Sequence, residues 1–132
     1  MGQLNSDINT IRIISADDVE INQRLLQKYL ENENIQLTKV YNGEDLVEEL
    51  DKDEYDLILS DIQMPIMNGI EATIIIRENP KYSKIPIIAL SAHSSQEDIN
   101  EILNAGANDY LVKPVKKDEI IEKINKWYSV NH

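Results

Sequence analysis

The chain has 132 residues, of which 42% are hydrophobic, so it can bury the core of one domain of ordinary size. It contains 24 acidic and 13 basic residues, and the net charge of -11 would repel the phosphate backbone of DNA or RNA. The absence of cysteine excludes disulfide bonds and thiolate metal sites. No apolar run approaches the roughly 20 residues needed to span a bilayer. We therefore expect a cytoplasmic domain that neither inserts into a membrane nor binds nucleic acid directly.

Residues 1–10 contain little that could pack and are expected to form a leader or linker, followed by one domain over residues 11–130. In that domain, short runs rich in β-branched residues alternate five times with longer segments of helical periodicity. Such alternation predicts a parallel sheet connected by helices. The strands are expected at Ile11 to Ala16, Gln36 to Tyr41, Leu57 to Asp61, Ile85 to Ala92 and Asp109 to Val112. The last three are almost entirely apolar, as expected of strands covered on both faces.

Residues at helical spacing predict a helix after each strand. The expected inward positions are Ile21, Leu25, Leu26, Tyr29 and Leu30, then Leu46, Val47 and Leu50, then Ile70, Ile74 and Arg77, then Ile99, Ile102 and Leu103, and finally Ile120, Ile121, Ile124 and Trp127 or Tyr128. The helix boundaries carry matching signals. These are Asn42-Gly43 before the second helix, Ser94 with Glu97 or Ser95 with Asp98 as a cap of the fourth, and Gly106 at its end.

Polar residues stand at the carboxyl ends of four predicted strands, where open α/β sheets bind their ligands. They are Asp17 and Asp18 after the first strand, Asp61 at the end of the third, Ser91 at the end of the fourth and Lys113 after the fifth. Three carboxylates in one place repel one another and require a cation, and hard oxygen ligands favour Mg²⁺. A carboxylate can also attack phosphorus while a metal ion and a lysine neutralise the transferred charge. The pattern therefore predicts phosphoryl transfer onto an aspartate.

The segment Ser60-Asp61-Ile62-Gln63-Met64-Pro65-Ile66-Met67-Asn68-Gly69, together with Asp17-Asp18, Ser91-Ala92 and Lys113-Pro114, resembles the response-regulator receiver family. The resemblance covers residues 10–128, with its motifs in the family's order. It implies an α/β fold of the flavodoxin-like (βα)5 kind, a five-stranded parallel sheet in the order 2-1-3-4-5 with helices on both faces. The motifs around Asp61 and Ser91 look most like those of receivers in hybrid sensor histidine kinases.

The resemblance implies a role for each residue of the acidic cluster. Asp61 matches the phosphoacceptor of the family. Mg²⁺, or Mn²⁺ in its place, would be bound by Asp17, Asp18, Asp61 and the backbone carbonyl of Gln63. Lys113 would bind the phosphoryl oxygens.

Other residues match the family's switch and its control of phosphoryl lifetime. Ser91 corresponds to the switch hydroxyl and Tyr110 to the aromatic residue that changes rotamer with it. Ser91 could also serve only to bond the strand end, and Tyr110 only to pack in the core. Gln63 and His93 match positions that influence hydrolysis of the phosphoryl group. The Lys113-Pro114 peptide is usually cis in such proteins.

The resemblance implies a signalling phosphoacceptor that assists its own phosphorylation and dephosphorylation, and not a conventional enzyme. The expected donor is a phosphohistidine of a sensor histidine kinase, with a histidine phosphotransfer domain as a second partner. The chain would be the receiver of a hybrid kinase, which can itself be membrane-bound, or a stand-alone response regulator. Phosphorylation would shift the surface formed by the fourth helix, fifth strand and fifth helix toward a second conformation. The same surface is compatible with the formation of a homodimer.

Three other functions remain as alternatives. A phosphatase of the haloacid-dehalogenase type uses a second acid two residues after its nucleophile, where this chain has Gln63. Flavin binding on the same topology needs a hydroxyl- and glycine-rich loop after the first strand, where Asp17 and Asp18 would repel the flavin phosphate. A pseudo-receiver would bind partners without phosphorylation and would not require the complete set of acids and lysine.

Overall fold

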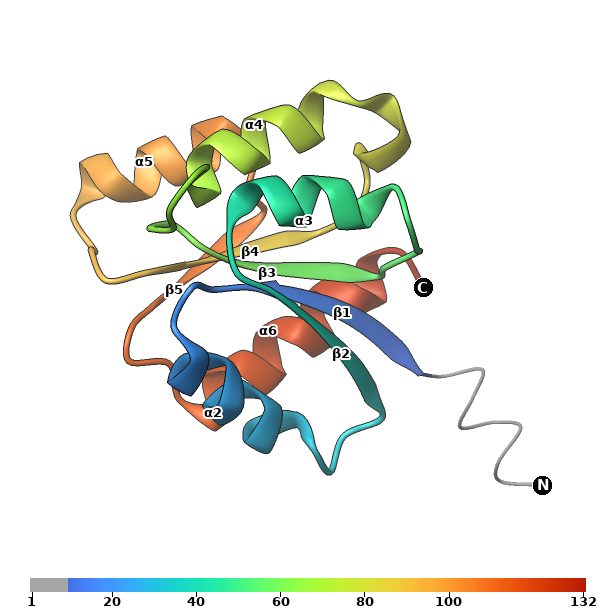
Figure 1. Ribbon diagram of the computed structural model, residues 1–132. Coiled ribbons are helices and arrows are strands. Elements are labelled where there is room, and N and C mark those ends of the chain that lie inside the picture. The colour runs from blue at the N-terminus through green and yellow to red at the C-terminus, as the bar shows by residue number, and fades with distance from the viewer. Residues whose placement is uncertain (1–9) are drawn as a thin grey trace.

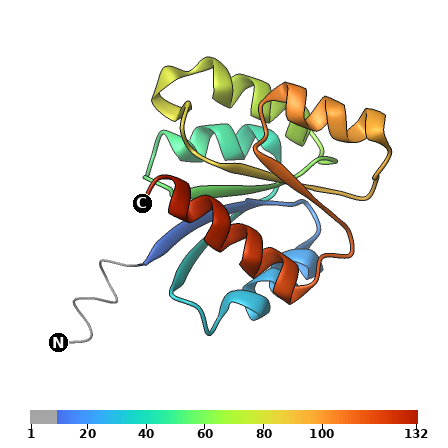
Figure 2. The ribbon, with the colours of Figure 1, turned by 180° about the vertical axis from the view of Figure 1, so that it is seen from behind.

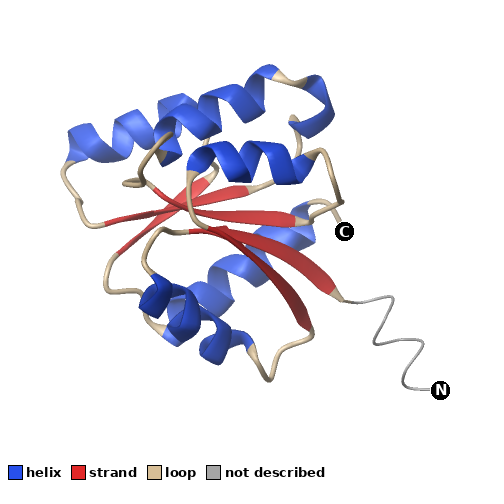
Figure 3. Cartoon of the chain, viewed as in Figure 1, coloured by secondary structure: helices blue, strands red, loops and turns tan. Residues whose placement is uncertain are grey.

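The protein is described by a computed structural model over residues 10–132, so the predicted leader lies, except for Thr10, outside the described residues. A sheet of five parallel strands forms the middle of three layers (Figure 3). Its strands are Ile11–Ala16 (β1), Ile35–Val40 (β2), Leu57–Asp61 (β3), Ile87–Ser91 (β4) and Asp109–Val112 (β5). They follow the order β2-β1-β3-β4-β5, which confirms the predicted topology.

Helices cover both faces of the sheet, as Figures 1 and 2 show from opposite sides. The helical elements are Glu20–Leu30 (α2), Gly43–Leu50 (α3), Gly69–Glu78 (α4), the 3₁₀ turn Pro80–Tyr82 (η1), Gln96–Ala105 (α5) and Lys117–Val130 (α6). Helices α3, α4 and α5 lie on one face, and α2 and α6 lie on the other. Over the described residues, each helix is too short or too polar to span a lipid bilayer.

The central strands supply both hydrophobic cores because successive side chains of a strand point to opposite faces. Ile13 of β1 packs in the core under α2 and α6, whereas the next residue, Ile14, packs under α3, α4 and α5. In β3, Leu57 and Leu59 enter the first core and Ile58 the second. The continuous apolar runs of these strands are thus explained by burial on two sides.

Three strand predictions differ from the structure. Strand β2 begins and ends one residue earlier than predicted, because its last pairing is Val40 with Ala16 and Tyr41 lies beyond it. Strand β4 starts at Ile87 because Pro86 has no N–H to donate to a neighbouring strand. Strand β5 lies at the edge of the sheet; Tyr110 and Leu111 pack in the cores on its two faces, as predicted, whereas its last residue, Val112, is 36% exposed.

The helices also depart in part from their predicted inward stripes. Four residues expected inside are exposed: Ile21, Leu25, Ile74 and Leu103. The cap of α5 is Ser95, whose hydroxyl accepts from the Asp98 N–H, and Gly106 ends this helix with a φ of 121°. Both observations agree with the sequence signals.

Candidate functional site

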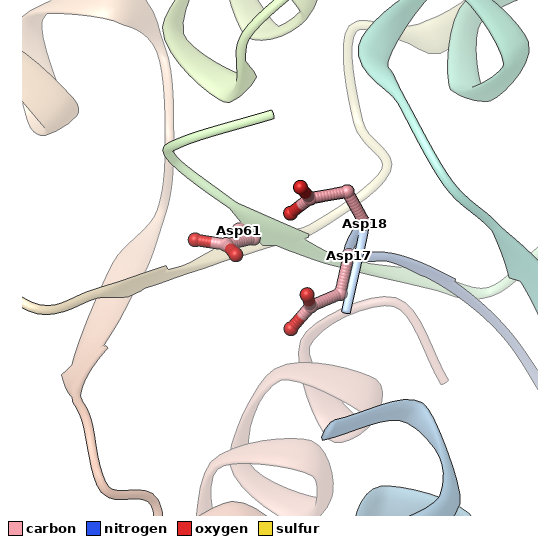
Figure 4. Close-up of side chains that lie close together, drawn as sticks. All are labelled: Asp17, Asp18 and Asp61. Atoms are coloured by element: carbon pink, nitrogen blue, oxygen red, sulfur yellow. The ribbon is translucent and has the colours of Figure 1, made fainter. Parts of the chain in front are cut away.

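The acidic residues meet at the end of the sheet where the parallel strands finish. Asp61 is the last residue of β3, whereas Asp17 and Asp18 follow β1 directly. One oxygen from each of the three carboxylates lies within 4.8 Å of the other two. Figure 4 shows the three side chains side by side at this edge. The cluster follows from topology, since the carboxyl ends of neighbouring parallel strands lie together.

The three carboxylates differ in burial and in hydrogen bonding. Asp17 is 3% exposed and Asp61 is 5% exposed, whereas Asp18 is exposed to solvent. Oδ1 of Asp17 accepts from the Val19 N–H at 2.9 Å, and Oδ1 of Asp61 accepts from the Gln63 N–H at 3.3 Å. Three clustered anionic oxygen donors, one of them open to water, form the hard ligand set that Mg²⁺ prefers. The donor chemistry of this chain therefore fits a magnesium ion.

Lys113 forms ion pairs with two carboxylates of this cluster. Its Nζ donates to Oδ2 of Asp61 at 2.8 Å and lies 3.6 Å from Oδ2 of Asp17. The lysine is held at this point by its backbone, whose N–H donates to the carbonyl of Ser91 at 2.8 Å. The peptide bond from Lys113 to Pro114 is cis, as the resemblance implied. Strand β5 thus brings a positive charge from 52 residues away to Asp61.

The electrostatic environment of Asp61 opposes its ionisation. Burial raises the pKa of Asp61 above its ordinary value, and the neighbouring Asp17 raises it further. The hydrogen bond from Lys113 lowers the pKa but does not reverse the shift. A carboxylate that is desolvated and lies beside a like charge is destabilised until a further cation binds to it. Carboxyl groups whose pKa values are shifted in this way occur most often at functional sites.

The loop after Asp61 approaches it too closely for a side chain at Gly69. A Cβ atom on Gly69 would lie 2.1 Å from the Asp61 carbonyl oxygen. The Gly69 N–H donates to the carbonyl of Ile62 at 2.8 Å, so the start of α4 is fixed against the end of β3. A capping box between Asn68 and Glu71 completes this helix start. The close contact explains why glycine occurs at this position.

Gln23 holds the backbone that carries Asp17, and it was not among the predicted site residues. Its side chain is fully buried, and Nε2 donates to the backbone carbonyls of Ser15, Asp17 and Val40 at 2.9 to 3.1 Å. Its Oε1 accepts from the Ser15 hydroxyl at 2.8 Å. These bonds fix the corner between β1 and α2 from which Asp17 projects. A signal was present, because position 23 stands three and seven residues before the buried Leu26 and Leu30.

Of the remaining predicted residues, Gln63 bonds to Asp61 through its backbone N–H alone, and Ser91, His93 and Tyr110 have their described hydrogen bonds elsewhere. The Ser91 hydroxyl is buried and exchanges bonds of 3.0 Å with the backbone N–H and carbonyl of His93. His93 and Gln63 are exposed, and their side-chain nitrogens lie 3.4 Å apart. Tyr110 is half-buried against the core under α3, α4 and α5. The structure therefore brings Asp17, Asp18, Asp61 and Lys113 together and leaves these four around them.

Comparison with known proteins assigns the chain to a family. The profile of the response regulator receiver domain matches residues 13–125. This chain belongs to the response regulator receiver family. It is 36% identical over 126 residues to hybrid signal transduction histidine kinase B of Dictyostelium discoideum, covering 87% of this chain and 6% of that kinase. The receiver chain thus spans a small part of this longer relative.

Solved receiver structures agree with the fold. The receiver domain of a sensor histidine kinase from Pseudomonas aeruginosa is 33% identical, with a TM-score of 0.85 over 91% of this chain and 98% of that one. That receiver has a magnesium ion in its active-site cleft. A chain from the co-crystal of the Saccharomyces cerevisiae phosphotransfer protein Ypd1 with the Ssk1 receiver domain is 32% identical, with a TM-score of 0.86. The match covers 92% of this chain and 91% of that chain.

Proposed function

We propose that this receiver accepts a phosphoryl group from a phosphohistidine onto Asp61. The observation that carries the proposal is the 2.8 Å bond from Lys113 Nζ to Oδ2 of Asp61 within a cluster of three carboxylates. A lysine in this position can interact with the nucleophilic carboxylate and with the oxygens of a phosphoryl group that is transferred to it. The chain is then a phosphoacceptor that takes part in its own phosphorylation and dephosphorylation, and not an enzyme with an independent substrate.

The transfer requires one bond to form and one to break. A carboxylate oxygen of Asp61 attacks phosphorus, the phosphorus–nitrogen bond of the donor breaks, and its electron pair returns to the imidazole ring. Lys113 balances negative charge on the phosphoryl oxygens during transfer. The carboxylates of Asp17, Asp18 and Asp61 and the backbone carbonyl of Gln63 would bind Mg²⁺ or Mn²⁺. A bound divalent ion supplies charge neutralisation at the same oxygens.

The switch would use Ser91 and Tyr110. The Ser91 hydroxyl now bonds to the backbone of His93, and a phosphoryl group on Asp61 offers it a more highly charged acceptor. Movement of this loop would change the space beside Tyr110 and bias the surface of α5, β5 and α6. Gln63 lines the cleft that contains Asp61, and its side chain lies 3.4 Å from that of His93, so the two residues would control the access of water to the acyl phosphate.

The partners follow from the phosphohistidine donor. We infer that a sensor histidine kinase phosphorylates this receiver, which belongs either to a longer hybrid kinase or to a response regulator. A histidine phosphotransfer protein would exchange the same group with it, and the surface of α5, β5 and α6 would bind the output partner or a second copy. We expect such exchange to take place in the cytoplasm, where the domain would be free or part of a membrane-bound kinase.

Intact mass spectrometry tests the proposal directly. The protein is incubated with acetyl phosphate in the presence and absence of Mg²⁺, and Asp61→Asn is treated in the same way. We expect a gain of one phosphoryl group that requires the metal and is absent from the variant. Circular dichroism of both proteins verifies their folding. Equal uptake by Asp61→Asn would overturn the assignment of Asp61, and no uptake by either folded protein would favour a phosphorylation-independent receiver.

A further inference from the structure

Gln23, near the start of α2, is 0% exposed, and it is the one amide side chain that is buried among the described residues. Burial removes an amide from water, which is unfavourable unless its polar atoms find partners in the protein. An apolar residue, like the buried Leu26 and Leu30 of the same helix, would fill this position without that cost. Packing of α2 therefore does not explain why glutamine occurs here.

The hydrogen bonds of the Gln23 side chain all go to the ends of β1 and β2. Its Nε2 donates to the carbonyls of Ser15 and Asp17 at 3.1 Å and of Val40 at 2.9 Å, and its Oε1 accepts from the Ser15 hydroxyl at 2.8 Å. The last paired residue of β1 is Ala16, so Asp17 lies beyond the pairing with both neighbouring strands. Gln23 thus supplies the donor that strand pairing no longer provides to the Asp17 carbonyl.

The connection that Gln23 holds contains two of the three clustered acids. It joins β1 to α2 over residues 17–19, and Figure 4 shows Asp17 and Asp18 on it. Val19 precedes the helix without a side-chain cap, and its N–H donates instead to Oδ1 of Asp17 at 2.9 Å. In the part of the chain that the structure describes, Gln23 is the one side chain from outside this connection that bonds to its backbone. The placement of both acids therefore depends on the Gln23 amide.

A restrained backbone matters at this point because the three carboxylates repel one another before a cation binds. Asp17, Asp18 and Asp61 each place an oxygen within 4.8 Å of the other two, and like charges at this separation favour moving apart. Ligands that are held together beforehand lose less conformational freedom when the ion binds. Groups that orient metal ligands in this way change metal affinity by about 10- to 100-fold when they are removed.

We propose that Gln23 is a positioning residue that sets the affinity of the acidic cluster for Mg²⁺. This inference rests on the proposed function, in which Asp17 and Asp18 bind the ion. Gln23 is fully buried and its amide is bonded to protein atoms, so it acts through the backbone of Asp17 and not on the ion. Its bonds join α2 to β1 and β2 (Figure 1), so three elements together fix the position of two metal ligands.

The test uses three variants that separate positioning from stability. Gln23→Met keeps an unbranched side chain of similar length and removes its donor and acceptor. Ser15→Ala removes the hydroxyl that bonds to Oε1 of Gln23 and leaves the amide nitrogen in place. Leu30→Ala is the matched control, because it creates a cavity at the far end of the same helix without removing a hydrogen bond of the Gln23 side chain.

Binding of the ion and phosphoryl uptake are measured separately. Isothermal titration calorimetry with MgCl₂ measures the Kd of each protein for the ion, and circular dichroism verifies folding and gives the thermal midpoint. Uptake from acetyl phosphate is followed by intact mass spectrometry at low and at saturating Mg²⁺. A purely structural role lowers the thermal midpoint alone, whereas positioning also raises the Kd.

We expect Gln23→Met to raise the Kd for Mg²⁺ about tenfold, as the loss of a group that orients metal ligands predicts. Its uptake should fall by a similar factor at low Mg²⁺ and return to within about twofold of the wild type at saturation, because the bound ion then holds the carboxylates itself. Ser15→Ala should raise the Kd about threefold, because one neutral hydrogen bond of the arrangement is lost. Leu30→Ala should keep the wild-type Kd although its thermal midpoint is lower.

Three results would overturn the positioning role. The first is an unchanged Kd in folded Gln23→Met or, where that variant does not fold, in Ser15→Ala. The second is an equal rise of the Kd in Leu30→Ala, which would attribute the effect to lost stability, and the third is a deficit in uptake by Gln23→Met that persists at saturating Mg²⁺. A folded wild type that binds no Mg²⁺ and accepts no phosphoryl group would instead count against the proposed function. The two proposals therefore fail in different measurements.

Discussion

Strand β5 separates two lysine–aspartate pairs of almost equal length. At its end, Lys113 lies 2.8 Å from Asp61, and at its beginning Lys123 of α6 lies 2.9 Å from Asp109. The lysine side chains are 25% and 26% exposed, and the aspartate side chains are 7% and 13% exposed. By distance and burial alone, the two pairs should behave alike.

Their protonation equilibria differ in direction. Burial raises the pKa of Asp61, Asp17 adds to the increase, and Lys113 only partly opposes it. Burial also acts to raise the pKa of Asp109, but hydrogen bonds from Lys123 and Trp127 outweigh it, and the net pKa is lowered. An ion pair therefore stabilises its carboxylate only when the other groups around that carboxylate cooperate.

The difference lies in the number of donors and in the nearest like charge. Oδ2 of Asp109 accepts from Lys123 and from Trp127 Nε1, both at 2.9 Å, and Oδ1 accepts from the Tyr110 N–H at 2.8 Å. No other carboxylate is among the causes of its lowered pKa. Asp61 instead shares its lysine with a second buried acid. We conclude that the Asp109 pair joins β5 to α6. At the site, by contrast, one lysine faces two buried carboxylates, so their negative charge is only partly neutralised.

The largest expected difference is in chemistry. We expect Lys113→Met to slow phosphoryl uptake from acetyl phosphate about 100-fold, because it removes a cation that stabilises the transferred charge. Lys123→Met, the matched change in the other pair, should alter the rate by less than about twofold. Initial rates from intact mass spectrometry measure both variants. Equal rates for the two would show that the pairs are functionally equivalent.

The next difference is in stability. We expect Asp109→Asn to lower the free energy of unfolding by about 2 kcal/mol at neutral pH, because charged hydrogen bonds from Lys123 and Trp127 are weakened. Since the pKa of Asp109 is lowered by folding, its contribution is complete above the unfolded pKa of about 3.9 and disappears as pH falls through the folded value. Urea unfolding followed by the fluorescence of Trp127, the one tryptophan in the chain, measures the change across pH. A deficit that persists in acid would contradict this assignment.

The corresponding change at the site should have the opposite sign. We expect Asp61→Asn to raise the free energy of unfolding by about 1 kcal/mol at neutral pH in EDTA, because it removes a desolvated charge beside Asp17. The raised pKa of Asp61 means that the wild type loses stability as pH rises from the unfolded toward the folded pKa. The advantage of the variant should therefore vanish below pH of about 3.9. Urea unfolding at several pH values checks both the sign and the window, and a destabilised variant would contradict the prediction.

The smallest expected effect is that of the metal. At about three times its Kd, Mg²⁺ should stabilise the wild type by about 0.8 kcal/mol. Asp18→Asn should reduce this increment, because it removes the exposed ligand, whereas Asp109→Asn should retain it. Unfolding curves with and without Mg²⁺ measure the increment. Loss of the metal effect in Asp109→Asn alone would place the ion elsewhere.

The predictions from sequence agree best with the structure for the polar residues at the strand ends, whose proximity follows from the order of the strands. Asp17, Asp18, Asp61 and Lys113 each stand at or directly after a strand end, so parallel pairing alone gathers them at one edge. Agreement is poorest on the helix faces. Ile21 and Leu25 follow helical spacing yet are exposed, whereas Gln23 between them is fully buried. Periodicity does not reveal that a glutamine can be satisfied by three backbone carbonyls at a corner.

The sequence by itself determined the fold class, through the alternation of elements, and the set of polar residues at the strand ends, through motifs that are local in the chain; the strand order was implied by the resemblance of those motifs to the receiver family. The tertiary structure alone decided that Asp61 resists ionisation while Asp109 does not, and that Gln23 is buried and bonded at the corner that carries Asp17. Burial, the count of hydrogen-bond donors and the nearest like charge depend on residues far apart in the sequence. They are therefore defined only in the folded chain, where those residues come together.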